Sequence, residues 1–186
     1  MRISELISKL KSNRQHYWNK WKLKPIELSN IKKVLVVSDT HNNYLALENV
    51  IELEKPDIII HAGDHEYDPD FLKNNNIIFV EGNNDYFGPK ELILSINNLK
   101  IALIHGHKQY HPFHWHTKLE NYFQDENVDL IIYGHSHKEV LDKQKRPWIL
   151  NPGSIAIPRN KSLTRTYAII EFDSTNNPII YFKTTN

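Results

Sequence analysis

The chain has 186 residues, of which 40% are hydrophobic and 24% charged, a composition that suits one globular domain with a sizeable core and leaves little room for two. Cysteine is absent, which excludes disulfides and thiolate metal sites, and no apolar run is long enough to cross a bilayer. The start MRISELISKLKS has scattered charges in place of the apolar core of a secretory signal, so we expect a cytoplasmic enzyme or binding protein with no membrane partner.

The formal net charge of +1 hides a basic N-terminal arm. Residues 1–33 carry nine Lys or Arg and two Glu, a net charge of +7, so residues 34–186, the expected catalytic or binding domain, carry −6. Apolar side chains between Ile3 and Trp21 recur at three- and four-residue steps, which predicts an amphipathic helix that Pro25 ends. The arm could recruit nucleic acid or another acidic surface. We favour packing against the body or a second subunit, because two tryptophans on one stripe favour burial.

The first part of the body alternates apolar strands with helices. Strands are predicted at Val34–His41, Asp57–Asp64 and Ile77–Asp85 from their apolar runs. A helix is predicted at Tyr44–Glu54, where apolar residues have helical spacing, and a short one around Phe71–Leu72. This order predicts a parallel sheet with right-handed crossovers, and hence an α/β domain.

The second part is richer in short strands and has fewer helices. We expect strands at Lys100–His107 and Asp129–His137 and a helix at Thr117–Gln124. A second sheet packed on the first is the arrangement that this pattern favours. Three further strands are expected within residues 146–154, 165–173 and 178–183.

Polar donor side chains directly follow five of the apolar runs, which end in SDTH, AGD, GNND, IHGH and YGHSH. Ligands bind at the C-terminal ends of strands in open α/β sheets, and glycine lets the backbone turn sharply there. Oxygen and nitrogen donors without sulfur suit Mn²⁺, Zn²⁺ or Fe. Seven donors exceed one tetrahedral site but suit two ions roughly 3.5–4 Å apart that share a bridging carboxylate. The donors are Asp39, His41, Asp64, Asn83, His105, His135 and His137.

As an ordered series, D-x-H, G-D, G-N-x-D, H-G-H and G-H-x-H resemble the motifs of the calcineurin-like metallophosphoesterase superfamily. GNND, HGH and the later NPGSIAIPR make the chain most similar to its small prokaryotic phosphodiesterases of the YfcE type. The likeness runs from about Val34 to the final strand. It implies two mixed β-sheets packed as a sandwich and flanked by helices, a four-layer α/β fold with the site at one end.

The resemblance also implies how the seven donors divide between two divalent metal ions, with Mn²⁺ expected and Ni²⁺, Zn²⁺ or Fe as alternatives. His135 and His137 stand two residues apart on an extended segment and lean to the same side, so one loop would serve both ions. Asp64 would bridge the ions. One ion would be held by Asp39, His41, Asp64 and His137, and the other by Asp64, Asn83, His105 and His135.

Such a centre implies a metal-dependent phosphoesterase that hydrolyses a phosphodiester, for example a nucleotide, by attack of a metal-activated hydroxide. Asp64 would take part as the bridging ligand, and Asp85 would orient the ligands from outside the metal shell. Where the protein-phosphatase branch has a leaving-group histidine, this chain has Asn84, which cannot donate that proton. His107 is then the nearest candidate acid, with an orienting role as the alternative.

Histidine is concentrated in HKQYHPFHWH, residues 107–116. One interpretation is a substrate loop whose aromatic side chains stack on a base while its histidines meet phosphate. The favoured interpretation is an exposed loop or a packing contact. The residues concerned are Tyr110, His111, Phe113, His114, Trp115 and His116.

Three other features near the motifs have ordinary interpretations. His61 lies inside a buried strand and is expected to be a core histidine with satisfied hydrogen bonds. His65, directly after Asp64, could lie near the site, but an ordinary loop position is favoured. The turn at Pro152–Ser154 is placed near the site by the resemblance, without a catalytic role.

Three functions compete. The leading one is the dinuclear phosphodiesterase, and a phosphomonoesterase or nuclease on the same centre is the nearest alternative, because pocket shape decides among such substrates. A non-catalytic scaffold, such as the retromer subunit that has this fold, is an alternative of another class. Seven intact donor positions argue against it. Relatives of this type also make a homo-oligomer an expectation.

Overall fold

The computed structural model describes residues 25–185, so the helix predicted for the N-terminal arm lies outside the described residues. The strands are β1 (Ile26–Leu28), β2 (Lys33–Val37), β3 (Ile58–His61), β4 (Ile77–Phe79), β5 (Glu91–Ile96), β6 (Leu99–Ile104), β7 (Leu130–Ile132), β8 (Glu139–Asp142), β9 (Trp148–Pro152), β10 (Thr166–Phe172) and β11 (Pro178–Thr184). The helices are α2 (Tyr44–Glu54), α3 (Pro69–Asn74) and α4 (Trp115–Tyr122), with the 3-10 turns η1 (His107–Gln109) and η2 (Gln124–Glu126).

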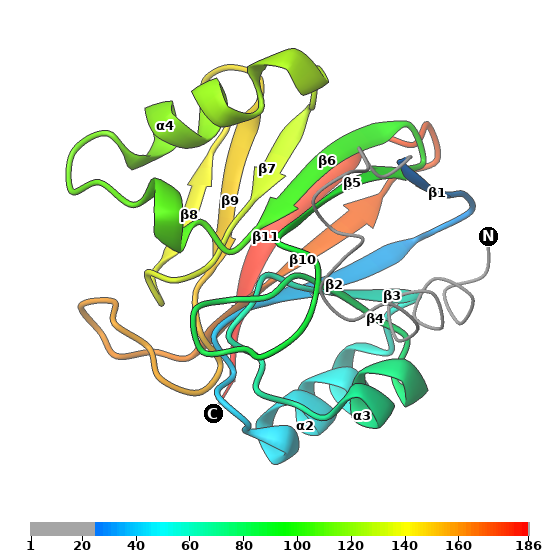
Figure 1. Ribbon diagram of the computed structural model, residues 1–186. Helices are drawn as coiled ribbons and strands as arrows, with labels where there is room; N and C mark the ends of the chain where they lie inside the picture. Colours follow the sequence, from blue (N-terminus) through cyan, green and yellow to red (C-terminus); the bar gives the residue numbers. More distant parts are fainter. Residues whose placement is uncertain (1–24, 186) are drawn as a thin grey trace.

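The strands form two sheets packed face to face. Figure 1 shows α4 on the outer side of one sheet and α2 and α3 on the outer side of the other. Both sheets mix parallel and antiparallel strands. The predicted sandwich of two mixed sheets flanked by helices is confirmed. None of the helices in the described part of the chain is long and apolar enough to span a membrane.

The five-stranded sheet has the order β11-β10-β2-β3-β4. Its strands β2, β3 and β4 are parallel, with α2 and α3 as the connections between them. This confirms the alternation of strands and helices that the apolar periodicity predicted. Helices cover one face of this sheet and the second sheet covers the other, so β2 and β3 are buried on both faces and read as continuous apolar runs.

The six-stranded sheet has the order β1-β5-β6-β7-β9-β8. Strands β5 and β8 were not predicted. Residues of β5 alternate between buried and half-buried, and every residue of β8 is half-buried, so neither carries the long apolar run on which the prediction relied. Strand β1 pairs in parallel with β5, with Leu28 opposite Ile96. The segment 26–28, which the sequence assigned to the arm, is therefore an edge strand of this sheet.

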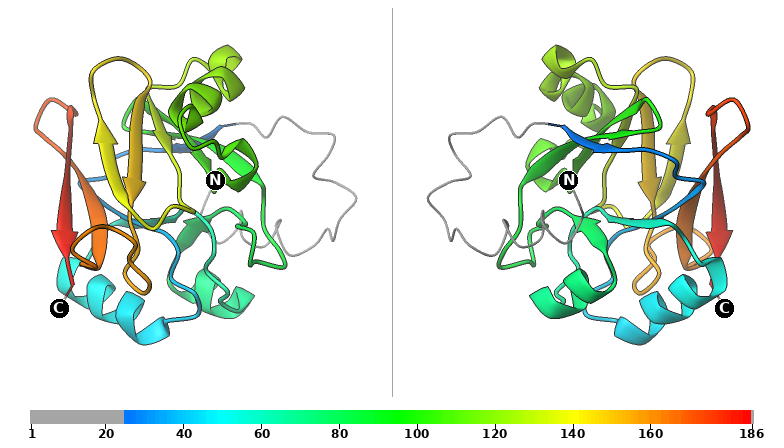
Figure 2. Two further views of the ribbon diagram at one scale, coloured as in Figure 1. Left: turned by 90° about the vertical axis from the view of Figure 1, so that its left-hand side faces the viewer. Right: turned by 90° about the vertical axis from the view of Figure 1, so that its right-hand side faces the viewer.

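Three apolar clusters fill the spaces between the four layers. Val34 and Val36 of β2 belong to the cluster between the sheets, whereas Leu35 and Val37 belong to the cluster under α2 and α3. Side chains alternate in this way because successive residues of a strand point to opposite faces. Leu119 of α4 packs in the third cluster, against the six-stranded sheet. Figure 2 shows the layers from two sides.

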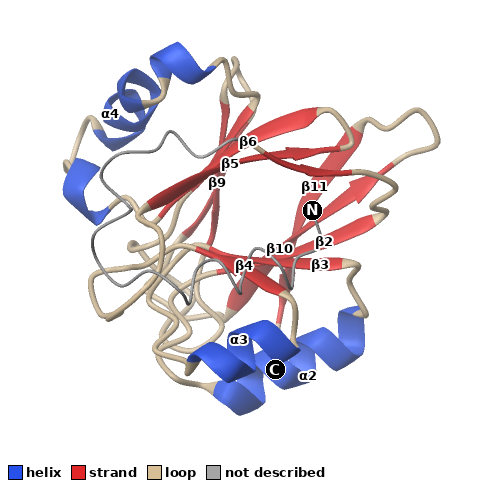
Figure 3. Cartoon of the chain, turned by 45° about the vertical axis from the view of Figure 1, so that its right-hand side comes forward, coloured by secondary structure: helices blue, strands red, loops and turns tan. Residues whose placement is uncertain are grey.

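The loops that follow β2, β3, β4, β6 and β7 gather on one side of the molecule (Figure 3). Parallel strands point the same way, so their C-terminal ends meet at a common edge. This edge carries the predicted metal ligands.

Helix α2 ends on a buried carboxylate that ties it to β10 and β11. The side chain of Glu54 is 1% exposed and accepts hydrogen bonds from Lys183 Nζ at 2.8 Å and from the Tyr167 hydroxyl at 2.7 Å. Burial alone would raise the pKa of Glu54, but the bonds from Lys183 and Tyr167 outweigh burial and lower that pKa. The carboxylate therefore stays charged inside the fold.

Lys183→Met is expected to lower the free energy of unfolding by about 1–2 kcal/mol at neutral pH, because a buried carboxylate loses a charged donor. Because the pKa of Glu54 is lowered in the folded state, this stabilisation is fully present at pH values above the ordinary pKa of 4.5. It is lost as the pH falls through the folded-state pKa. Urea unfolding at neutral pH and near pH 3 measures both effects. Lys118→Met, at an exposed position of α4, is the control, and an equal loss in the two variants would contradict the role of Lys183.

Candidate metal centre

Side chains from four loops meet at the common edge. Asp39 and His41 follow β2, Asp64 follows β3, His105 follows β6 and His137 follows β7. His137 Nε2 lies 3.2 Å from Asp39 Oδ1 and 3.4 Å from His41 Nε2. His105 Nε2 lies 3.5 Å from Asp64 Oδ2. The structure therefore brings these five predicted ligands together.

Three of the histidines are oriented by acceptors on their Nδ1 side. His105 and His137 each donate Nδ1–H to a backbone carbonyl, and His41 donates Nδ1–H to Glu66 at 2.7 Å. A carbonyl has no hydrogen to give, so the proton must lie on Nδ1 in the first two. Nε2 then keeps a free lone pair, which is how metal-ligating histidines are oriented in proteins.

The free lone pairs face other acceptors. His41 Nε2 and His137 Nε2 lie 3.4 Å apart, and His105 Nε2 lies 3.2 Å from the side-chain oxygen of Asn83. Asp39 Oδ1 is buried and has no hydrogen-bond partner among residues 25–185. Acceptors at such distances repel one another unless a cation or a proton lies between them. The donor set therefore fits a metal centre.

Two groups of three donors have the spacing of a metal site. They are Asp39 with His41 and His137, and Asp39 with Asp64 and His105. Within each group the donor atoms lie within 4.8 Å of one another. The two groups share Asp39, whereas the sequence placed the bridge at Asp64.

Asp64 lies in the second group and is held by Asn84. The Asn84 backbone N–H donates to Asp64 Oδ1 at 2.8 Å, and the Asn84 amide donates to Asp64 Oδ2 at 2.7 Å. Burial alone would raise the pKa of Asp64, but the neighbouring His105 imidazole and the hydrogen bonds from Asn84 hold that pKa well below its usual range. The side chain is thus an ionised carboxylate ready to bind a cation.

The remaining predicted ligands, Asn83 and His135, lie beside the second group. The Asn83 oxygen is 3.2 Å from His105 Nε2. The His135 ring centroid is 5.3 Å from that of His105, and the His135 backbone N–H donates to Asp39 Oδ2 at 3.0 Å. His135 is in neither group of three, so its part in metal binding stays a prediction.

Five of the seven predicted ligands have a left-handed backbone. Their φ angles are 52° for Asp39, 43° for His41, 54° for Asp64, 65° for His135 and 57° for His137. Residues other than glycine adopt this conformation rarely, at a cost of order 1–3 kcal/mol each. Such strain concentrates at functional sites, where the surrounding structure enforces it. Here it turns the chain sharply after each strand, so that the side chains face the centre.

Glycine is required beside two ligands because no side chain would fit. A Cβ atom at Gly82 would lie 2.0 Å from Asp64 Oδ1 and 2.4 Å from Asp64 N. A Cβ atom at Gly134 would lie 2.0 Å from Ser38 Oγ and 3.0 Å from His105 Nδ1. These glycines are those of the GNND and GHSH motifs, and each allows a ligand loop to approach the other half of the site.

Asp85 joins two of the loops. Its carboxylate accepts hydrogen bonds from the backbone N–H groups of Gly82 at 2.7 Å and Glu66 at 2.8 Å, and it lies 3.3 Å from His65 Nδ1. His65 is on a loop, as predicted, yet it is fully buried because Phe79 and other aromatic rings surround it. Asp85 touches no predicted ligand through its side chain, so it would orient them through the backbone of these loops.

Two smaller predictions are confirmed. His61 is a core histidine with satisfied hydrogen bonds, because Nε2 lies 2.9 Å from the Thr40 hydroxyl and Nδ1 accepts from Gly63 N–H at 3.2 Å. The turn at residues 152–154 lies at the site, since the Ser154 hydroxyl donates to the carbonyl oxygen of Asp39 at 2.7 Å.

Part of the histidine-rich loop packs against the centre. The ring centroids of Tyr110 and Trp115 lie 5.9 Å and 6.0 Å from that of His135. His116 Nε2 lies 3.0 Å from the hydroxyl of Tyr133, which is buried. These contacts support the packing interpretation for this stretch, and those of Tyr110 and Trp115 hold His135 beside the second group.

His107 lies at the edge of the centre and lines a pocket beside it. Its ring centroid is 5.4 Å from that of His105 and 6.1 Å from that of His135. Burial, helped by repulsion from His105 and Lys108, lowers the pKa of His107 to about 4. The imidazole is therefore neutral at physiological pH, which fits the orienting role better than that of an acid.

The sequence did not predict three supporting contacts. Glu66 accepts a hydrogen bond from His41, Asn84 donates to Asp64, and Ser154 donates to the carbonyl oxygen of Asp39. Glu66 and Asn84 stand within two residues of Asp64 and Asn83 in the sequence. That proximity is the one signal that could have pointed to them. Ser154 is 115 residues from Asp39 and has no such signal.

The fold and the donor set define a class of protein: a two-sheet α/β domain in which histidines and carboxylates that could hold a metal ion gather at the strand ends. Residues 33–175 match the model of the calcineurin-like phosphoesterase superfamily domain, and the chain belongs to this family of metal-dependent phosphoesterases. It is 34% identical over 154 residues to a probable metallophosphoesterase of Mycoplasma genitalium, an alignment that covers 81% of this chain and 94% of that protein.

Two further comparisons agree. The crystal structure of a predicted phosphoesterase from Streptococcus pneumoniae has a TM-score of 0.72 and 32% identity, covering 82% of this chain and 89% of that one. A phosphodiesterase of Methanocaldococcus jannaschii is 29% identical over 147 residues, which cover 65% of this chain and 82% of that protein.

Proposed function

We propose that the chain is a dinuclear metal-dependent phosphodiesterase. The observation that carries the proposal is the set of converging ligand atoms, in which the Nε2 atoms of three histidines lie 3.2–3.5 Å from carboxylate oxygens, an amide oxygen or one another. One ion would be bound by Asp39, His41, Asp64 and His137, and the second by Asp64, Asn83, His105 and His135.

Bound divalent ions, with Mn²⁺ preferred, supply Lewis-acid charge to phosphoryl oxygens and lower the pKa of water. The protein's share is orientation. The acceptors on Nδ1 of His41, His105 and His137 fix the rings, and Asn84 holds the Asp64 carboxylate. A site ordered in this way needs little rearrangement when charge develops on the phosphoryl group.

Two observations favour a diester over a monoester. A relative from Methanocaldococcus jannaschii is a phosphodiesterase, and a pocket of about 220 Å³ adjoins His105 and His107. A diester has a second substituent on phosphorus, and this pocket offers it space. His107 is the proposed contact to the substrate at the pocket wall. The cytoplasmic location, the homo-oligomer and the weaker expectation of nucleic-acid binding stay predictions from the sequence.

Chelator-stripped protein is expected to cleave neither bis-p-nitrophenyl phosphate nor p-nitrophenyl phosphate. Adding Mn²⁺, Ni²⁺, Zn²⁺ or Mg²⁺ in turn is expected to restore cleavage, with Mn²⁺ most effective and with kcat/KM for the diester at least about tenfold above that for the monoester. Nitrophenolate absorbance measures the rates, and elemental analysis of the reloaded protein should count two ions per chain.

The outcomes separate the candidate functions. A preference for the monoester would replace the proposal with a phosphomonoesterase on the same centre. Two bound ions without cleavage of either compound would favour the scaffold. One ion per chain at full activity would contradict the dinuclear centre.

A further inference from the structure

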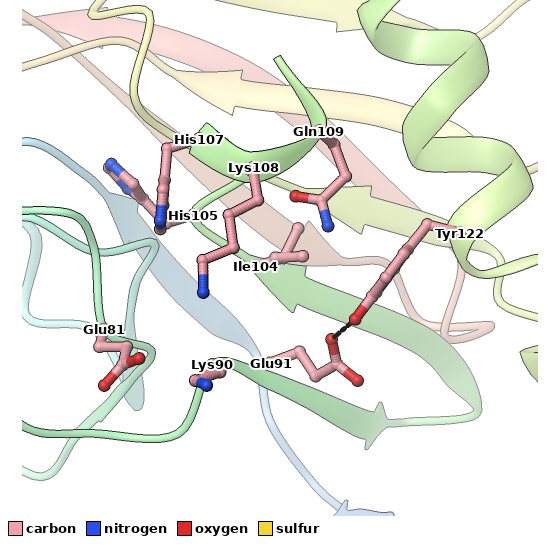
Figure 4. Close-up of a pocket in the computed structure, with 10 residues that line it drawn as sticks. Glu81, Lys90, Glu91, Ile104, His105, His107, Lys108, Gln109 and Tyr122 are labelled. Atoms are coloured by element: carbon pink, nitrogen blue, oxygen red, sulfur yellow. Dashed lines mark hydrogen bonds between the residues drawn. The ribbon is translucent and has the colours of Figure 1, made fainter.

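The pocket beside the metal centre has a definite position. It lies between the start of β5, the end of β6 with η1, and the last residue of α4 (Figure 4). His105 is both a predicted metal ligand and part of the pocket wall. A phosphoryl group at the centre would therefore place one of its ester substituents in this pocket. This step rests on the proposed function.

The size of the pocket limits that substituent. Its volume of about 220 Å³ is below the roughly 300–1,000 Å³ of sites that enclose a whole drug-sized ligand. Ile104 is the one aliphatic side chain in a lining that is otherwise histidine, lysine, glutamate, glutamine, tyrosine and glycine. The pocket thus suits a small substituent, and the charged ends of its lysines and glutamates offer that substituent hydrogen-bonding partners.

The charges in the pocket nearly cancel. Lys90 and Lys108 carry two positive charges, and Glu81 and Glu91 carry two negative ones. Glu91 accepts a hydrogen bond from the Tyr122 hydroxyl at 2.5 Å. This pair lies at the end of the pocket that is opposite His105 and His107 (Figure 4). A second anionic group on the substrate would meet two carboxylates as well as two ammonium groups. The charges of the pocket therefore do not favour a substrate with a second anionic group.

Glu81 is the acceptor without a partner. Its carboxylate makes no hydrogen bond or ion pair to any described residue, although burial raises its pKa and Lys90 and Lys108 lie near enough to lower it. Lys90 and Lys108 likewise make no side-chain hydrogen bond within residues 25–185. Glu81 is half-buried, whereas the two lysines are exposed. A half-buried carboxylate that the fold leaves unpaired is satisfied by water or by a ligand. Vicinal hydroxyls fit best, because each can donate to a carboxylate and accept from an ammonium group.

We propose that this pocket selects a small hydroxyl-bearing substituent, such as a glycerol or pentose unit, on the substrate phosphate, with Glu81 as the residue that recognises its hydroxyls. Lys108 reaches into the pocket beside His107 (Figure 4) and donates to the same hydroxyls. Glu81 is thus a specificity-determining residue, and the substrate class is a phosphodiester of a polyol or sugar.

Binding of three phosphate monoesters to the Mn²⁺-loaded protein tests the proposal without relying on turnover. Glycerol 3-phosphate offers two hydroxyls, propyl phosphate offers none, and 2-carboxyethyl phosphate offers a second anion. Calorimetry is expected to show glycerol 3-phosphate binding about tenfold more tightly than either of the others. In Glu81→Gln the ratio between glycerol 3-phosphate and propyl phosphate is expected to fall to within about twofold.

Glu52→Gln is the matched control, because Glu52 is exposed on α2, away from the pocket lining, and the wild-type ratio should persist in it. Circular dichroism checks that Glu81→Gln is folded. Equal affinities for glycerol 3-phosphate and propyl phosphate in the wild type would overturn the proposal, as would an unchanged ratio in Glu81→Gln. Tightest binding of 2-carboxyethyl phosphate would replace the polyol with an acidic substituent. Selective binding without cleavage of nitrophenyl esters would leave the pocket assignment standing and remove the proposed enzyme activity.

Discussion

Asp64→Asn is expected to lower kcat/KM for bis-p-nitrophenyl phosphate by more than about 100-fold, since even residues outside the metal shell typically contribute 10–100-fold. Asparagine has the size of aspartate but no charge, and the donor Asn84 would then face an amide. The variant is expected to fold, because the site lies at the edge of the sheets and outside the three apolar clusters.

Metal binding gives Asp64→Asn a second measurement that does not depend on turnover. A ligand that binds the folded chain alone raises its melting temperature, so Mn²⁺ should stabilise the wild type and stabilise this variant much less. Asp125→Asn, at an exposed position of η2, is the control and should keep both properties. Full activity with two bound ions in Asp64→Asn would show that Asp39, which both donor groups share, can serve as the bridge alone.

Gly82→Ala is expected to weaken Mn²⁺ binding by at least about tenfold and to cost roughly 1–3 kcal/mol of unfolding free energy. The new Cβ atom would lie 2.0 Å from Asp64 Oδ1, 2.4 Å from Asp64 N and 2.8 Å from Asp64 Cγ. Because a backbone atom is among them, a side-chain rotation cannot relieve the contact, and the Asp64 carboxylate must move.

A double-mutant cycle separates this clash from a general loss of stability. In an Asp64→Ala background two of the three close atoms are absent, so Gly82→Ala should cost less unfolding free energy there than in the wild type. Urea unfolding of the four proteins, together with Mn²⁺ titrations, measures the coupling. Equal costs in the two backgrounds would mean that Gly82 is needed for some reason other than the approach of Asp64.

The parallel half of the fold could be predicted because a strand that is buried on both faces has an almost continuous apolar sequence. The strands β2 and β3 are apolar at nearly every position, and the helices between them have helical spacing. Strands β5 and β8 could not be found in this way. One face of β5 and both faces of β8 are half-buried, so their sequences differ less from those of the neighbouring loops.

The side chains that gather at the site could also be predicted, since Asp, His and Asn follow buried strands whose C-terminal ends meet at one edge. Their supporting contacts could not. His137 is oriented by the carbonyl of Ile157, His105 by that of Ala62, and Asp39 by the hydroxyl of Ser154. These partners are 20, 43 and 115 residues away, and two of the three act through the backbone, which no residue type reveals.

The sequence by itself therefore determined the sandwich, the edge at which the site lies and the loops that carry the candidate metal ligands, because apolar periodicity and donor chemistry are local properties of the chain. The tertiary structure decided the rest. It alone showed that Asp39 lies in both donor groups, that Asn84 holds Asp64, and that Glu81 and Lys108 share a pocket with His107. Such relations depend on how distant loops pack, and packing is a property of the whole fold.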